Sequence, residues 1–264
     1  MAFMTRLPLS ILVSLLITAC GEKPAPVATP TVPTASSAPA SQAPVAPAVA
    51  PSAVKTPEPA KTTFWSTERL HTEIKFHNPG YEGNGEFSME EGQPIAISLR
   101  GAKITNLEFL NQLKPLALDL SGTPIKDIRP VKGMQLLELY LEDSPVTDLS
   151  PLRGMPLEKL YLSRTPVSDL SALEGAPLIE LNLVETKVTD LTPLAKSRTQ
   201  MLWLTGTPVA NITALQALPL VSLTLHRTLV TDLSPLSGSA LQRLHIGQTS
   251  VTDLSPLKGM SLTR

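Results

Sequence analysis

Carboxylate and amide side chains recur every 21 residues along the C-terminal part of the chain. Their positions are Asn106, Asp127, Asp148, Asp169, Asp190, Asn211, Asp232 and Asp253. Oxygen ligands stacked about 5 Å apart on neighbouring copies of a repeat could bind cations. Each of them, however, precedes a leucine or isoleucine and often a Ser-Pro pair, a pattern in which aspartate caps a tight turn. Since asparagine replaces aspartate twice without changing the spacing, we predict turn capping and no metal site.

Residues that could carry out catalysis are not grouped in the sequence. No serine, histidine and aspartate converge, no glycine-rich phosphate loop occurs, and no carboxylate pair stands apart from the repeated row. His226 and His245 fall on neighbouring copies of the repeat but two positions out of register, which places their Cβ atoms about 8 Å apart. With no carboxylate or cysteine beside them they are poor zinc ligands. We therefore expect no enzymatic activity and no cofactor.

The single cysteine, Cys20, follows an apolar N-terminal segment. Residues 7–17 have the length of a secretory signal and are too few to span a membrane. The run from Leu16 to Gly21, LITACG, resembles the lipobox of bacterial lipoproteins. That resemblance implies removal of residues 1–19 as a signal peptide and acylation of Cys20, and two or more acyl chains anchor a protein firmly. The alternative is an ordinary signal peptide with a chance cysteine.

The resemblance to a lipoprotein also implies a location. Gly21, in place of an aspartate, is compatible with export to an outer membrane. We therefore expect a lipid-anchored protein of the bacterial cell envelope, in the outer membrane, exposed either to the periplasm or at the cell surface.

The elements that must position the other candidate residues are built from a 21-residue repeat. One mostly polar position anchors its eight copies: Ala102, Thr123, Ser144, Thr165, Thr186, Thr207, Thr228 and Thr249. Leucine or isoleucine stands five and three residues before each anchor, and valine or isoleucine two after it. This uninterrupted period predicts a stacked solenoid. The alternation predicts a short strand with its leucines inward, and the short return path predicts 3₁₀ turns or extended chain on the convex side.

The repeat resembles the leucine-rich repeat, in particular the short bacterial type of the internalins, through the motif VTDLSPL at residues 230–236 and 251–257. The resemblance covers residues 94–264, which hold eight copies and an incomplete ninth. It implies a right-handed arc with a parallel β-sheet on the concave face, the face that such proteins most often use for binding. Threonine replaces the usual asparagine at the anchor. Its hydroxyl could bond a neighbouring turn, but it cannot satisfy both a donor and an acceptor as an amide does.

The outward-facing strand positions differ from copy to copy, so specificity is expected there. Tyr140, Tyr161 and Trp203 share one row, and rigid amphipathic rings of this kind anchor interfaces. The alternative is that aromatic residues simply suit an exposed sheet face. Three glutamates beside the rings lean this part of the face towards negative charge. The candidate ligand-binding residues are completed by Glu138, Glu142, Lys159, Glu180, His226, Arg243 and His245.

Residues 63–93 do not follow the repeat and are expected to cap its first copy. Ser66 is a candidate N-cap of a short helix with Leu70 and Ile74 on one face. Trp65 and Phe76 are expected to help cover the end of the solenoid. Residues 20–62 are rich in proline and alanine without an apolar period, which predicts a disordered tether able to reach about 120 Å.

The C-terminal end lacks a matching cap, because a ninth copy begins at residue 261 and stops at residue 264. An open sheet edge is a liability that proteins normally cover. Three alternatives stay open: the edge pairs with another molecule, it frays, or the natural product is longer.

Two functions follow from these expectations. The first is a membrane-anchored envelope lipoprotein that binds a protein or a glycan on its concave face. The alternative is a structural or self-associating envelope component without a specific soluble ligand. The net charge of −1 provides no general attraction for nucleic acid, so no nucleic-acid partner is expected. A single cysteine excludes intramolecular disulfides.

Overall fold

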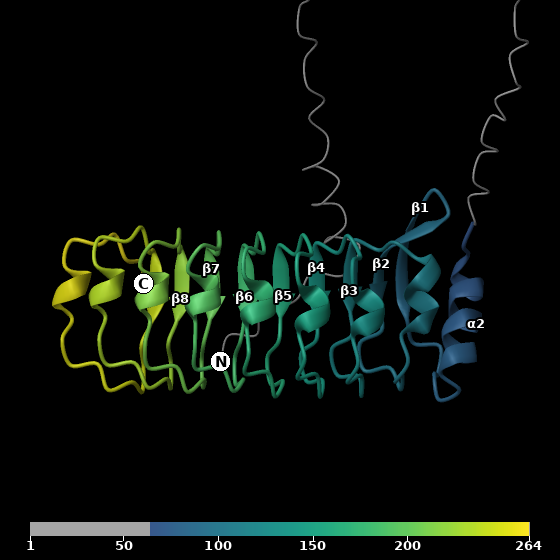
Figure 1. The fold of residues 1–264 in the computed structure, drawn as a ribbon, viewed down its shortest axis with the longest axis horizontal. Helices are drawn as coiled ribbons and strands as arrows, with labels where there is room; N and C mark the ends of the chain where they lie inside the picture. Colours follow the sequence, from purple (N-terminus) through teal and green to yellow (C-terminus); the bar gives the residue numbers. More distant parts are fainter. Residues whose placement is uncertain (1–63, 264) are drawn as a thin grey trace, which may run out of the picture.

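The computed structural model describes residues 64–263. Cys20, the expected signal peptide at residues 1–19 and the expected tether at residues 20–62 lie outside the described residues. Within them, no helix is both long and apolar enough to cross a membrane. The described chain runs as a row of stacked repeats from the helix α2, drawn in blue, to the yellow C-terminal copies (Figure 1).

A nine-stranded sheet in sequence order forms one side of the solenoid. Strand β1 pairs antiparallel with β2, and every later strand pairs parallel with its neighbour. The strands are β1 (Glu86–Glu90), β2 (Gln93–Ser98), β3 (Ala117–Asp119), β4 (Glu138–Tyr140), β5 (Lys159–Tyr161), β6 (Glu180–Asn182), β7 (Met201–Trp203), β8 (Ser222–Thr224) and β9 (Arg243–His245). The register advances by one 21-residue copy per strand, as in Leu139 opposite Leu160. This confirms the predicted leucine-rich-repeat solenoid.

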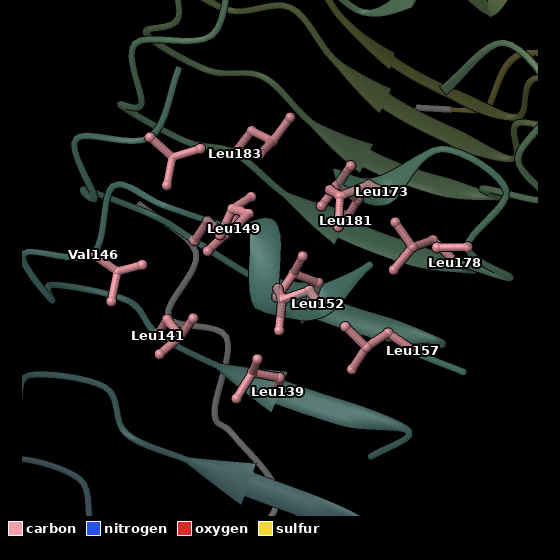
Figure 2. Packing of buried hydrophobic residues seen from close by; sticks show 14 of the residues in the cluster. Leu139, Leu141, Val146, Leu149, Leu152, Leu157, Leu173, Leu178, Leu181 and Leu183 are labelled. Carbon is pink, nitrogen blue, oxygen red and sulfur yellow. The ribbon is translucent and has the colours of Figure 1, made fainter. Parts of the chain in front are cut away.

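The core is a continuous stack of leucine and valine layers between the sheet and the return path (Figure 2). Leu139 and Leu141 from one copy lie below Leu181 and Leu183 from a later one, and all four are fully buried. Side chains alternate across a strand, so the two leucines of each copy point to the same side. Because every copy contributes the same layers, each repeat buries its apolar face against its neighbours.

The return path is made of short 3₁₀ turns, as the proline-containing motif predicts. They cover Glu108–Gln112, Arg129–Val131, Ser150–Leu152, Ser171–Leu173, Thr192–Leu194, Thr213–Leu215, Ser234–Leu236 and Ser255–Leu257. In the third, Asp148 Oδ1 accepts a hydrogen bond from the Ser150 N–H at 2.8 Å, and Oδ2 accepts one from the Ser150 hydroxyl at 2.9 Å. The same backbone bond recurs in all eight copies. The predicted capping bond is confirmed. Its position differs by one residue, because the N-cap of this turn is Leu149 and Asp148 precedes it.

The anchor hydroxyls bond within their own repeat, so the expectation of bonds to a neighbouring turn is wrong. Thr165 Oγ1 donates to the Leu162 carbonyl at 2.7 Å, and every anchor with a hydroxyl makes the equivalent bond. A hydroxyl has a single hydrogen, so one that donates to the carbonyl three residues earlier cannot also donate to a neighbouring turn. Adjacent copies are joined instead by backbone bonds, such as that from the Arg164 N–H to the Val184 carbonyl at 2.8 Å.

The residue before each anchor has a left-handed backbone in all eight copies, a feature that the sequence analysis missed. Three of the eight residues are glycines, with φ between 68° and 72°. The other five carry side chains and have φ between 55° and 57°. Glycine adopts this conformation freely, whereas a residue with a Cβ pays about 1 kcal/mol or more. The recurrence of glycine at this position in the sequence was the available signal.

The N-terminal cap consists of α2 (Thr67–His77) and the β1–β2 hairpin. Ser66 Oγ accepts a hydrogen bond from the Arg69 N–H at 3.2 Å, which confirms the predicted N-cap. Leu70 and Ile74 are buried against the first repeat, and Trp65 is buried as well. The expectation for Phe76 is wrong: it is 78% exposed, because it lies on the face of α2 that turns away from the core.

The last copy is less covered than the others. Leu244 and Ile246 are half-buried and Leu254 is exposed, whereas their counterparts in earlier copies are buried. Thr263 continues towards a further strand position by donating its N–H to the Gln242 carbonyl at 2.7 Å.

Candidate ligand-binding face

Three aromatic rings form a row across the outward side of β4 to β7. The centroids of Tyr140 and Tyr161 are 5.0 Å apart, and those of Tyr161 and Trp203 are 6.0 Å apart. Strands β5 and β7 are separated by β6, hence by about 10 Å. The rings of Tyr161 and Trp203 therefore lean towards each other over β6, where Asn182 occupies the matching position. We call Tyr140, Tyr161 and Trp203 the aromatic row.

The tyrosine hydroxyls are held by glutamates of the same face. Tyr140 donates its hydroxyl hydrogen to Glu138 Oε2 at 2.8 Å, and Tyr161 donates to Glu180 Oε2 at 2.5 Å. Burial and the adjacent carboxylates raise the pKa of both tyrosines above their usual range. Both hydroxyls therefore stay protonated at ordinary pH and act as donors, which fixes how the rings lie on the sheet.

Lys159 lies between the two glutamates and offsets one of their two negative charges. Its Nζ is 3.1 Å from Glu138 Oε1 and 3.8 Å from Glu180 Oε1. Burial lowers the pKa of Lys159, but the attraction of the two carboxylates outweighs it, so the pKa is raised. The expected negative charge of this part of the face is therefore reduced but not removed, because Glu138 and Glu180 share one lysine.

A second set of charges lies beside the aromatic row, towards the cap. Arg100 Nε is 3.2 Å from Asp119 Oδ2, and an Arg100 terminal nitrogen is 3.6 Å from Glu142 Oε2. Glu142 also accepts a long hydrogen bond of 3.4 Å from the Ser163 hydroxyl. Arg100 spans β3 to reach Glu142 on the copy beyond it. Arg100 and Asp119 were not among the predicted site residues, since nothing in their spacing distinguishes them.

The remaining candidates lie apart from the aromatic row, on β8 and β9. Arg243 and His245 are exposed on β9. His226, from the copy before, lies over Gly247, where a Cβ would stand 2.8 Å from His226 Nδ1. Within residues 64–263, no group of three or more histidine, cysteine, aspartate or glutamate side chains is placed to hold a metal ion.

The loops along one edge of the face carry a further charged pair that the sequence analysis did not predict. Arg164 bonds both carboxylate oxygens of Asp143, with N–O distances of 2.5 and 2.6 Å. The two residues occupy the left-handed position of successive copies. Hydrogen bonding to Arg164 lowers the pKa of Asp143. The bidentate contact ties neighbouring copies together along the rim of the face.

Two solved structures similar to this chain are internalins of Listeria monocytogenes. An internalin (inlF) has 29% sequence identity and a TM-score of 0.58, covering 64% of this chain. The chain spans 59% of the length of that protein. An internalin C2 (inlC2) has 24% identity and a TM-score of 0.61, covering 73% of this chain and 89% of its own. No protein-family model and no curated protein matches the chain. The fold is thus that of an internalin-like leucine-rich-repeat protein.

Proposed function

We propose that this chain binds a protein ligand on the concave face of its repeats, while held at a bacterial membrane through Cys20. The observation that supports ligand binding most is the aromatic row, whose two tyrosines are fixed by Glu138 and Glu180. Ordering a mobile side chain on binding costs about 0.5–1.5 kcal/mol. Rings that are already held in place avoid much of that cost.

The size of the face suits a protein partner. Eight parallel strands, β2 to β9, at about 4.8 Å spacing give a face about 35–40 Å long. The outward positions of each copy span five residues, about 17 Å, so the face offers about 600 Å², at the lower end of what one partner contributes to a typical stable complex. A glycan is the second ligand class, because flat rings flanked by carboxylates also stack on sugars; a protein makes fuller use of the length.

Membrane attachment rests on the sequence of the N-terminal segment. Cys20 stands at the one position that the lipobox requires, and it is the only cysteine in the chain. Acylation there would leave the repeats tethered to the membrane by the proline- and alanine-rich residues that follow. Replacing Cys20 with serine should release the protein from the membrane fraction; retention of the Cys20→Ser chain would contradict the anchor.

The ligand-binding proposal is tested by removing the aromatic row. The Tyr161→Ala/Trp203→Ala variant and the wild-type chain are each used to capture cross-linked partners from envelope extract. We expect a wild-type partner that is absent with the variant. Phe76→Ala is the control, because this aromatic residue is exposed on α2, away from the face. An unchanged partner set in the double variant, with loss on deletion of residues 239–264, would favour the self-associating alternative.

A further inference from the structure

The two ends of the concave face differ in whether their arginine and lysine side chains have carboxylate neighbours on the face. Near the cap, Arg100 contacts Asp119 and Glu142. In the middle, Lys159 contacts two glutamates. At the other end, residues 201–205, 222–226 and 243–247, which form β7 to β9 and their continuations, include no aspartate or glutamate. Positive charge at this end is therefore not balanced from within the face.

Arg243 is the central cation of this end. It is exposed on β9, and none of the carboxylates in residues 64–263 forms an ion pair with it. Arg227, on the rim of the preceding copy, is 58% exposed and reaches Glu185 at 3.9 Å, a distance that leaves its other N–H groups available. An exposed guanidinium retains five donors, which suit a carboxylate in a bidentate arrangement.

The two histidines add donors around Arg243. His245 lies two residues along β9 on the same side of the sheet, about 6.8 Å away along the strand. His226 approaches from β8 and lies over Gly247, which has no side chain to obstruct it. Alternate side chains of an extended peptide repeat at the same interval of about 6.8 Å, so neighbouring acidic side chains could meet Arg243 and His245 together.

We infer that this basic end, formed by His226, Arg227, Arg243 and His245, binds an acidic segment of the protein ligand. The inference rests on the proposed function and deepens it by stating the chemistry of the partner. Near the cap and in the middle, carboxylates outnumber the cations that contact them, whereas Arg243 on β9 has no carboxylate partner among residues 64–263, so the face has an acidic part and a basic end. An acidic segment on β8 and β9 fixes the direction of the partner, while its apolar groups contact the aromatic row.

The test uses the purified full chain and two fluorescein-labelled probes, a peptide of ten glutamates and a peptide of ten lysines. Fluorescence anisotropy at low and moderate salt should show binding of the glutamate peptide that salt weakens, whereas binding of the lysine peptide to the acidic part of the face should not fall in the Arg243→Gln variant. Arg243→Gln should weaken binding of the glutamate peptide by about tenfold, the loss of one charge-assisted contact. Arg153→Gln removes the same charge from an exposed position beside a 3₁₀ turn and should change nothing.

Several results would overturn the inference. They are no binding of the glutamate peptide at low salt, an equal loss in Arg153→Gln, and tighter binding of a heparin fragment than of the glutamate peptide. The aromatic double variant could lose the envelope partner while Arg243→Gln leaves peptide binding unchanged. That result would overturn the role given to the basic end and leave the proposed function standing. Loss of peptide binding in Arg243→Gln, with the envelope partner retained by the aromatic double variant, would support the basic end and overturn the role given to the aromatic row.

Discussion

Replacing Tyr161 with phenylalanine tests whether hydrogen bonding fixes the aromatic row. The substitution keeps the ring and its packing and removes only the hydroxyl that donates to Glu180 at 2.5 Å. A hydrogen bond to a charged group contributes about 1.5–3 kcal/mol to stability. Glu180 remains 3.8 Å from Lys159 and its side chain is 16% exposed, so solvent and lysine compensate in part. We therefore expect a loss of about 1.5–2 kcal/mol, at the lower end of that range.

The same change should loosen the ring and weaken ligand capture. The ring centroids of Trp203 and Tyr161 are 6.0 Å apart, so tryptophan fluorescence can follow the unfolding of this region in urea. Near-ultraviolet circular dichroism can detect the loss of the fixed ring pair. Tyr81→Phe is the matched control. The Tyr81 hydroxyl accepts from the Gly85 N–H at 2.8 Å and lies 2.8 Å from His71 Nδ1, in the cap and away from the face.

The two variants should separate stability from binding. Tyr81→Phe should lower stability by about 1 kcal/mol and leave capture of the envelope partner unchanged. Tyr161→Phe should lower both. If Tyr161→Phe matches the wild-type chain in near-ultraviolet signal and in partner capture, the hydroxyl does not hold the ring, and the argument from preorganisation is refuted.

Three further predictions concern the repeat itself. Gly206→Ala should destabilise the chain by about 1 kcal/mol in urea unfolding, because φ is 72° there and the new Cβ would lie 3.0 Å from Glu185 Cγ; a neutral result would show that the left-handed position tolerates any residue. Thr165→Val should cost about 1 kcal/mol by removing the buried bond of 2.7 Å to the carbonyl three residues earlier, and equal stability would show that the bond is dispensable. The backbone N–H and hydroxyl of Ser150 lower the pKa of Asp148, so its contribution is present above the ordinary aspartate pKa and is lost as the pH falls through the lowered value. Asp148→Asn should reduce the slope of the urea midpoint against pH in that acid range, and an unchanged slope would contradict the capping argument.

The repeat, its strands, its core and its turns could be predicted from the sequence because each depends on short-range pattern. Leucine alternates with polar residues over a few positions, and Asp148 and Ser150 are two residues apart. The same pattern in every copy specifies the same local structure, and a constant period leaves one register for the sheet. The N-cap at Ser66 was predictable for the same reason.

The charge pairing of the face could not be predicted in this way. Lys159 had carboxylates available on both neighbouring strands and contacts one on each. Arg100 passes over β3 to reach Glu142, a copy beyond its nearest neighbour. These partners are 21 or more residues apart in the sequence, and the choice among them depends on side-chain conformations that compete for the same space.

The sequence by itself thus determined the solenoid and placed the candidate residues on one face, since a fixed period leaves one way to stack the copies. Only the tertiary structure decided how those residues act together. It shows the rings of Tyr161 and Trp203 leaning over Asn182, and two carboxylates near them sharing one lysine. It also shows Arg243 without a carboxylate partner among residues 64–263. The physical reason is that backbone register follows from local periodicity, whereas hydrogen bonds and ion pairs between side chains depend on the contents of several neighbouring copies at once.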